Sequence, residues 1–326
     1  MTHLVVGYPG PLSVAVVQRL VGRGETVCVV GGPGPALADG VEFIPGDCAK
    51  IDFGLSGAVY VRLCQLVTRV TVVETTEQLP PSEQGYRDLE SSRPVRVAAE
   101  VAEFARAAAQ LNGVVFLSSL AVFGDASGVV FEKDLDVGQS FSHQRDEVLA
   151  VAEKQIRALP VGLPCVIVRT ANLVGYESSG EILIGSELGR LAKFAVAAPD
   201  DCQFTFLDQP LHFETVERTA AVLVRVVPTY PAVTLHLIDD EPWTDRQLLT
   251  WFFERLHKRI TDVPRGTSAV SQLFRAATTQ SGRVRTSKAD FERNEAVRQV
   301  GDLLSREVGL TLENLFGRGP VKELTS

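Results

Sequence analysis

The chain has 326 residues, of which 45% are hydrophobic, so it is long enough for one large domain or for one domain with a smaller lobe. The formal net charge is −8, which gives no general basic field for nucleic acid or for an anionic membrane. No apolar run approaches the roughly 20 residues that a membrane-spanning helix needs.

The amino terminus and the cysteines predict the compartment of the protein and whether it has disulfides or a metal site. The first residues enter a strand pattern directly, without the basic and apolar regions of a signal peptide, so we expect a cytoplasmic protein. The five cysteines are scattered and show no CxxC spacing. We therefore expect neither a disulfide framework nor a metal site.

The first half of the chain alternates short apolar runs with helical patterns. Apolar runs occur at 4–6, 26–30, 41–44, 70–73 and 114–117, and helical spacing occurs at 12–21 and 97–111. Buried strands alternating with helices indicate βαβ units in a parallel sheet. The sequence thus predicts an α/β protein with a Rossmann-type doubly wound parallel sheet.

The second half continues this pattern and then loosens. A helix is expected at 146–159 and a strand at 164–168, but strict alternation ends after about residue 178. An amphipathic helix at 243–256, with Thr244 as its N-cap, and another helix at 290–308 complete the prediction. We expect a dinucleotide-binding-like domain over 1–175 and a smaller lobe over 176–326 that is interleaved with the core and receives a substrate or partner.

The turn after the first strand resembles a phosphate-binding loop. It reads Gly7-Tyr8-Pro9-Gly10-Pro11-Leu12-Ser13, a variant in which Gly7 makes the turn, Gly10 admits a pyrophosphate and Ser13 replaces a third glycine. Pro9 and Pro11 each remove an N–H from the loop. The second strand is also not followed by an acid or arginine before Asp39. The loop either binds a dinucleotide or only turns a strand into a helix. With these departures we predict no cofactor or weak NAD(P) binding.

Four segments together resemble the extended short-chain dehydrogenase/reductases, and most closely the branch of thioester reductases and male-sterility-like fatty-acyl reductases. They are the glycine loop, residues 41–47 ending in Gly46-Asp47 and continuing to 53–56, residues 116–125 and residues 168–175. The resemblance covers roughly residues 1–250. It implies a Rossmann-type fold, an adenine-side role for Asp47, and often a homodimer.

The resemblance also implies a catalytic tyrosine and lysine that this chain lacks. In those enzymes the tyrosine transfers the carbonyl proton, and the lysine lowers the pKa of the tyrosine and holds the nicotinamide ribose. By register Arg145 takes the place of the tyrosine and Leu149 that of the lysine, and no Tyr-x-x-x-Lys occurs elsewhere. Ser119 is the one catalytic position that keeps a suitable side chain.

Four further interpretations remain open at this point. Ser119 either orients a substrate oxygen or caps the next turn. His143 either acts as an acid or base or is an exposed residue before a helix. Arg145 either binds a carboxylate or phosphate or lies on a solvated face, and Glu74 either contacts a ligand or pairs with a basic residue.

These residues support three hypotheses about function. The first is a degenerate reductase that serves binding, scaffolding or regulation, with a small molecule in its cleft, a second copy or another protein as partner. The second is a non-redox isomerase, cyclase or dehydratase that uses Glu74, Ser119 or His143. The third is an NADP-dependent thioester or carbonyl reductase with an atypical active site.

Overall fold

The computed structural model describes residues 1–34, 37–73, 89–141, 144–183, 186–206, 208, 210–229, 232–238, 243–264 and 288–291. The elements of the first half are β1 (Thr2–Tyr8), α1 (Pro11–Gly22), β2 (Thr26–Gly31), β3 (Val41–Pro45), η1 (Ile51–Gly54), α2 (Gly57–Leu66), β4 (Arg69–Val72), α3 (Arg93–Ala107), β5 (Val114–Ser119), η4 (Leu120–Phe123), β6 (Ser127–Val130) and α4 (Gln144–Arg157).

The elements of the second half include both sheet strands and a separate lobe. They are β7 (Cys165–Thr170), β8 (Asn172–Gly175), α5 (Glu187–Ala197), β9 (Asp201–Phe204), β10 (Pro210–Leu211), β11 (Phe213–Thr215), α6 (Val216–Arg225), β12 (Val233–Leu237), β13 (Trp243–Thr244), α7 (Asp245–Arg255), β14 (Arg259–Asp262) and β15 (Lys288–Phe291). Of the helix expected at 290–308, the first two residues lie in strand β15, which corrects its start, and the rest falls outside the described residues.

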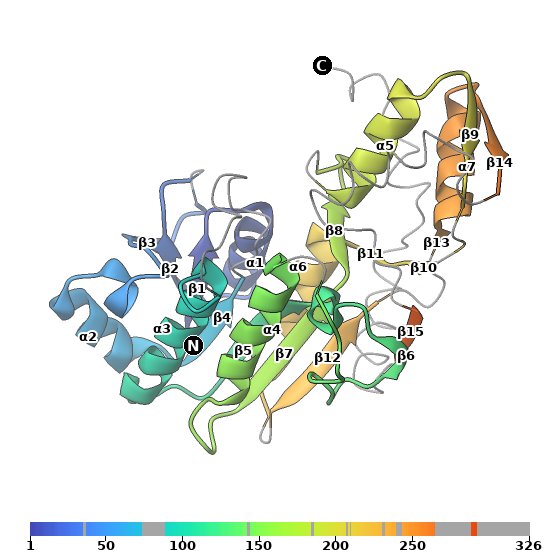
Figure 1. The fold of residues 1–326 in the computed structure, drawn as a ribbon. Coiled ribbons are helices and arrows are strands. Elements are labelled where there is room, and N and C mark those ends of the chain that lie inside the picture. Colours follow the sequence, from blue (N-terminus) through green and yellow to red (C-terminus); the bar gives the residue numbers. More distant parts are fainter. Residues whose placement is uncertain are drawn as a thin grey trace.

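The main sheet has seven parallel strands in the order β12-β7-β5-β4-β1-β2-β3 (Figure 1). The predicted Rossmann-type fold is confirmed. Strand order reverses between β1 and β4, because the chain first builds β2 and β3 on one side of β1 and then crosses to the other. Such a reversal opens a ligand site at the carboxyl edge of the sheet in open α/β folds.

Each face of the sheet is covered by helices that bury alternate strand residues. Val6, Val72 and Phe116 belong to one apolar core with residues of α2, α3 and α4. Val5 and Leu117, which have the opposite parity, belong to a second core with α1 and α6. This alternation is the pleat of the strands, whose successive side chains point to opposite faces.

A third apolar core lies in the lobe of α5, α7, β9 and β14, which stands apart from the main sheet in Figure 1. The Thr244 hydroxyl accepts a hydrogen bond from the Gln247 amide at the start of α7, so the predicted N-cap is confirmed. The Gln247 side chain in turn accepts from the Thr244 amide, which completes a capping box. Helix α6 and strand β12 return from this lobe to the main sheet.

Candidate functional site

The glycine loop forms a tight turn between β1 and α1. Gly7 has φ 106°, a conformation that favours glycine, and Gly10 is extended at the N-cap of α1 without a side-chain cap. Pro11 is the first residue of the helix. The buried Ser13 hydroxyl donates to Gly10 O over 2.9 Å, so Ser13 closes the loop on itself. The geometry leaves the amides of the first helical turn without intrahelical acceptors, which is the arrangement that binds phosphate at helix N-termini.

The loop lies at the point where the strand order reverses. The Val73 amide donates to Val6 O over 2.9 Å, which places the end of β4 beside the end of β1. A dinucleotide pyrophosphate would be held here by the loop backbone and the start of α1. Glu74 follows Val73 directly and lies outside the described residues, as does His143.

Asp47 is engaged in an ion pair after the edge strand β3. Its Oδ1 accepts from Arg93 over 2.6 Å and from the Ala49 amide over 3.2 Å. Partial burial raises the pKa of Asp47, but the bonds from Arg93 and Ala49 outweigh it and hold that pKa below its ordinary value. Asp47 is thus a fixed carboxylate that joins the β3 turn to the first turn of α3.

Ser119 is the last residue of β5 and caps the turn that follows. Its Oγ accepts from the Ala121 amide over 3.2 Å and so starts the 3₁₀ helix η4. The side chain is half-buried at the carboxyl edge, next to Thr170 in register on β7. The capping alternative is therefore visible in the structure, and the residue lies at the carboxyl end of β5.

Helix α4 carries Arg145 and Leu149, the two positions that the sequence register aligned with the tyrosine and the lysine. Arg145 is half-buried in its first turn. Leu149, one turn later, is 7% exposed and belongs to an apolar cluster with Val122, Phe123 and Val130. Residues spaced by four share a helix face, so both side chains point along the same side of α4. The lysine position is therefore built into an apolar core.

A buried polar cluster below the carboxyl edge was not predicted. Arg169 on β7 and Glu153 on α4 are both fully buried, and Arg169 Nε and one terminal nitrogen bond the two Glu153 oxygens over 3.0 and 2.6 Å. The Ser118 hydroxyl donates to the same carboxylate over 2.6 Å. Side-on pairing of this kind gives two charge-assisted bonds with fixed geometry.

The same cluster continues across the sheet to β12. Ser118, Arg169 and His236 are register neighbours on β5, β7 and β12. His236 Nε2 lies 3.1 Å from Arg169, and the Arg169 guanidinium stacks 4.4 Å from the Phe123 ring centroid. Its signal in the sequence is the arginine that follows the apolar residues of β7, which lies in the family-like segment 168–175.

No group of three or more His, Cys, Asp or Glu side chains in the described part of the chain is arranged to hold a metal ion. Among the same residues, no helix has the length and apolarity needed to cross a membrane.

Solved structures with the same fold include reductase domains and NAD-bound enzymes. The terminal R domain of the myxalamid PKS-NRPS pathway has a TM-score of 0.72 and 16% identity, over 92% of this chain and 85% of that domain. MoeE5, solved with UDP-glucose and NAD, has a TM-score of 0.64 and 18% identity, over 99% and 98%. WbmG of Bordetella bronchiseptica, solved with NAD and UDP, has a TM-score of 0.62 and 13% identity, over 97% and 92%.

These likenesses confirm the resemblance to extended short-chain dehydrogenase/reductases at the level of the fold. No protein-family model matches the sequence, and no curated protein sequence matches it.

Proposed function

We propose that this chain is a non-redox binding, scaffold or regulatory protein built on the fold of the extended short-chain reductases. The observation that carries the proposal is Leu149, which stands at the lysine position and is buried against Val122 and Phe123. A lysine there would have to place its charge in an apolar cluster, which is costly without a partner. Arg145, at the tyrosine position, stays protonated at neutral pH and cannot transfer a proton.

The proposal includes weak or no affinity for NAD(P). The loop turns tightly at Gly7 and leaves α1 without a side-chain cap, which fits a phosphate. Pro11, however, takes the N1 position, where it removes one of the donors that would face that phosphate. Asp47, at the adenine side, already bonds Arg93. The residues present can thus contact a pyrophosphate through the backbone, with fewer donors than a glycine-rich loop would supply.

Two measurements test the proposal together. NADH and NADPH oxidation is followed with aldehydes, ketones and acyl thioesters, and dinucleotide affinity is measured by calorimetric titration. We expect no turnover above that of a Ser119→Ala control and no micromolar binding. General acid–base catalysis contributes about 10²- to 10⁴-fold, so its loss leaves at most a slow background rate. Robust turnover that Ser119→Ala abolishes would refute the proposal.

The second candidate is a non-redox enzyme that uses Ser119. The position of Ser119 at the carboxyl end of β5 favours this candidate, because ligands bind at that edge in open α/β sheets. The discriminating experiment compares Ser119→Ala and His143→Ala in the biological role of the protein, once that role is assayed in cells. A binding or scaffold protein, acting through a second copy or another protein, should tolerate both changes. Loss of function in a variant that is folded and melts within a few degrees of the wild type would instead indicate catalysis.

A further inference from the structure

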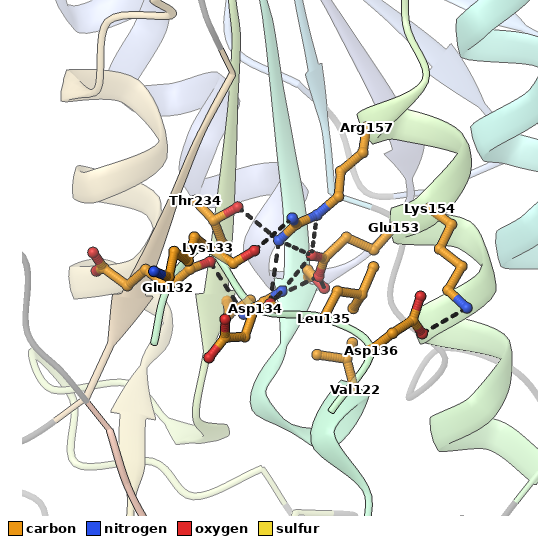
Figure 2. Close-up of polar contacts among 12 residues, drawn as sticks. Val122, Glu132, Lys133, Asp134, Leu135, Asp136, Glu153, Lys154, Arg157 and Thr234 are labelled. Carbon is orange, nitrogen blue, oxygen red and sulfur yellow. Dashed lines mark hydrogen bonds and ion pairs between the residues drawn. The ribbon is translucent and has the colours of Figure 1, made fainter. Parts of the chain in front are cut away.

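Two arginines below the carboxyl edge donate hydrogen bonds to three consecutive backbone carbonyls. We name residues 124–141, which run from η4 towards α4, the β5–α4 connection. Arg169 donates to Asp134 O over 2.5 Å and to Glu132 O over 3.4 Å, and Arg157 donates to Lys133 O over 2.9 Å. Figure 2 shows Glu153 and Arg157 of α4 directed at this stretch of backbone. The two arginines therefore link the buried polar cluster to the backbone of the β5–α4 connection.

One carboxylate holds both arginines in place. Glu153 accepts from Arg169, from Ser118 over 2.6 Å and from Arg157 Nε over 3.0 Å. Glu153 and Arg169 are fully buried, whereas Arg157 is 28% exposed. Because a buried charge without its partner is strongly destabilising, the pair has little freedom to rearrange while the protein stays folded.

The pair also sets how α4 faces the sheet. Residues 145, 149 and 153 are four apart and share one helix face. Glu153 is bound to Arg169, one residue before the end of β7, and Leu149 packs with Phe123 of η4. These two contacts orient the face of α4 that also carries Arg145.

We propose that Glu153 and Arg169 are positioning residues for the candidate site. Their ion pair fixes the backbone of residues 132–134 and the first turns of α4 relative to the carboxyl end of β5. The proposal goes beyond the proposed function because it concerns the geometry of the edge and holds for a binding protein and for an enzyme alike. Detection of reductase activity would overturn the proposed function and leave this proposal standing.

Hydrogen exchange of the full chain, read by mass spectrometry, tests the proposal with two variants. Glu153→Gln leaves Arg169 without its counter-ion, and the double variant Glu153→Leu/Arg169→Met removes both charges. In Glu153→Gln we expect amide exchange over 131–136 and 144–149 to become faster by about tenfold or more. This change corresponds to the loss of one charge-assisted hydrogen bond. In the double variant the melting temperature should recover relative to Glu153→Gln, because no unpaired buried charge remains.

The discriminating result is the exchange of the double variant. If the pair positions the connection, exchange over 131–136 stays fast although stability recovers. Without Arg169 the Glu132 carbonyl loses its donor, and the Asp134 carbonyl keeps only the longer bond from Arg157, over 3.4 Å. If the pair only stabilises the fold, exchange there returns to the wild-type rate together with the melting temperature. That second outcome, or fast exchange spread equally over β1, β2 and α7, would overturn the proposal.

A milder variant keeps the test decisive if Glu153→Gln does not fold. Arg157→Met removes the bond to Lys133 O from a side chain that is partly exposed. We expect faster exchange confined to 131–136. The matched control is Arg106→Met, an exposed helical arginine that pairs with Glu103 on α3, and it should leave that segment unchanged. Equal exchange in the two variants would contradict a positioning role.

Discussion

The turn at Gly124 offers a sharp test of how the β5–α4 connection is held. Gly124 has φ 53° and ψ −125°, a backbone conformation that residues other than glycine rarely adopt. A Cβ atom at this position would lie 2.2 Å from the backbone oxygen of Ser140. Gly124→Ala therefore cannot be accommodated by a side-chain rotation, and one of the two backbone segments must move.

The cost of that movement follows from the bonds that it breaks. Asp125 N donates to Ser140 O over 3.0 Å, and Ser140 N donates to Asp125 Oδ1 over 2.6 Å. A strained backbone conformation costs about 1–3 kcal/mol, and these two bonds contribute about 1 and about 1.5–3 kcal/mol. We expect Gly124→Ala to lower the free energy of unfolding by about 3.5–7 kcal/mol, a fall in melting temperature of roughly 10 °C.

Gly138 in the same connection supplies the matched control. It also has a positive φ, 79°, but a Cβ there meets nothing within 4 Å. Gly138→Ala should therefore cost only the left-handed conformation, about 1–2 kcal/mol. Urea and thermal unfolding of both variants measure the difference. Equal destabilisation by the two substitutions would refute the close approach of residues 124 and 140.

Three further predictions concern other parts of the chain. Burial lowers the pKa of His3 to about 4, although Glu25 raises it, so the unfolded state binds more protons below about pH 6.5. As the pH is lowered from 6.5 to 4, the free energy of unfolding measured in urea should fall by at most about 3 kcal/mol through His3. If the free energy of unfolding of a His3→Gln variant fell just as steeply, this would be contradicted. Lys258→Met should destabilise α5 by about 1–3 kcal/mol, because Lys258 Nζ donates to Val196 O over 2.6 Å and to Ala198 O over 2.5 Å. Hydrogen exchange of the α5 amides measures this, and unchanged protection there would count against it. Ser119→Ala should cost about 1 kcal/mol through loss of the cap on η4, measured by urea unfolding, and no change would show that the cap contributes nothing.

The sequence predicted the Rossmann-type sheet because the signals for it are local. Each buried strand is a short apolar run, each helix has a period near 3.6, and glycines or prolines separate them. Thr244 as the predicted N-cap marked the start of α7 in the same way, since the capping bond joins residues three apart. The helix placed at 290–308 shows the limit of such periodicity, because Asp290 and Phe291 belong to β15.

The absence of a Tyr-x-x-x-Lys motif can also be read from the sequence by itself, without coordinates. Only the tertiary structure decided the surroundings of Arg145 and Leu149. Leu149 could have been exposed, but the packing of α4 on η4 buries it with Phe123. Asp47 and Arg93 are 46 residues apart, and Glu153 and Arg169 are 16 apart on different elements. Such pairs depend on how helices cross the sheet and on strand register, which are set by long-range packing and leave no periodic trace in the sequence.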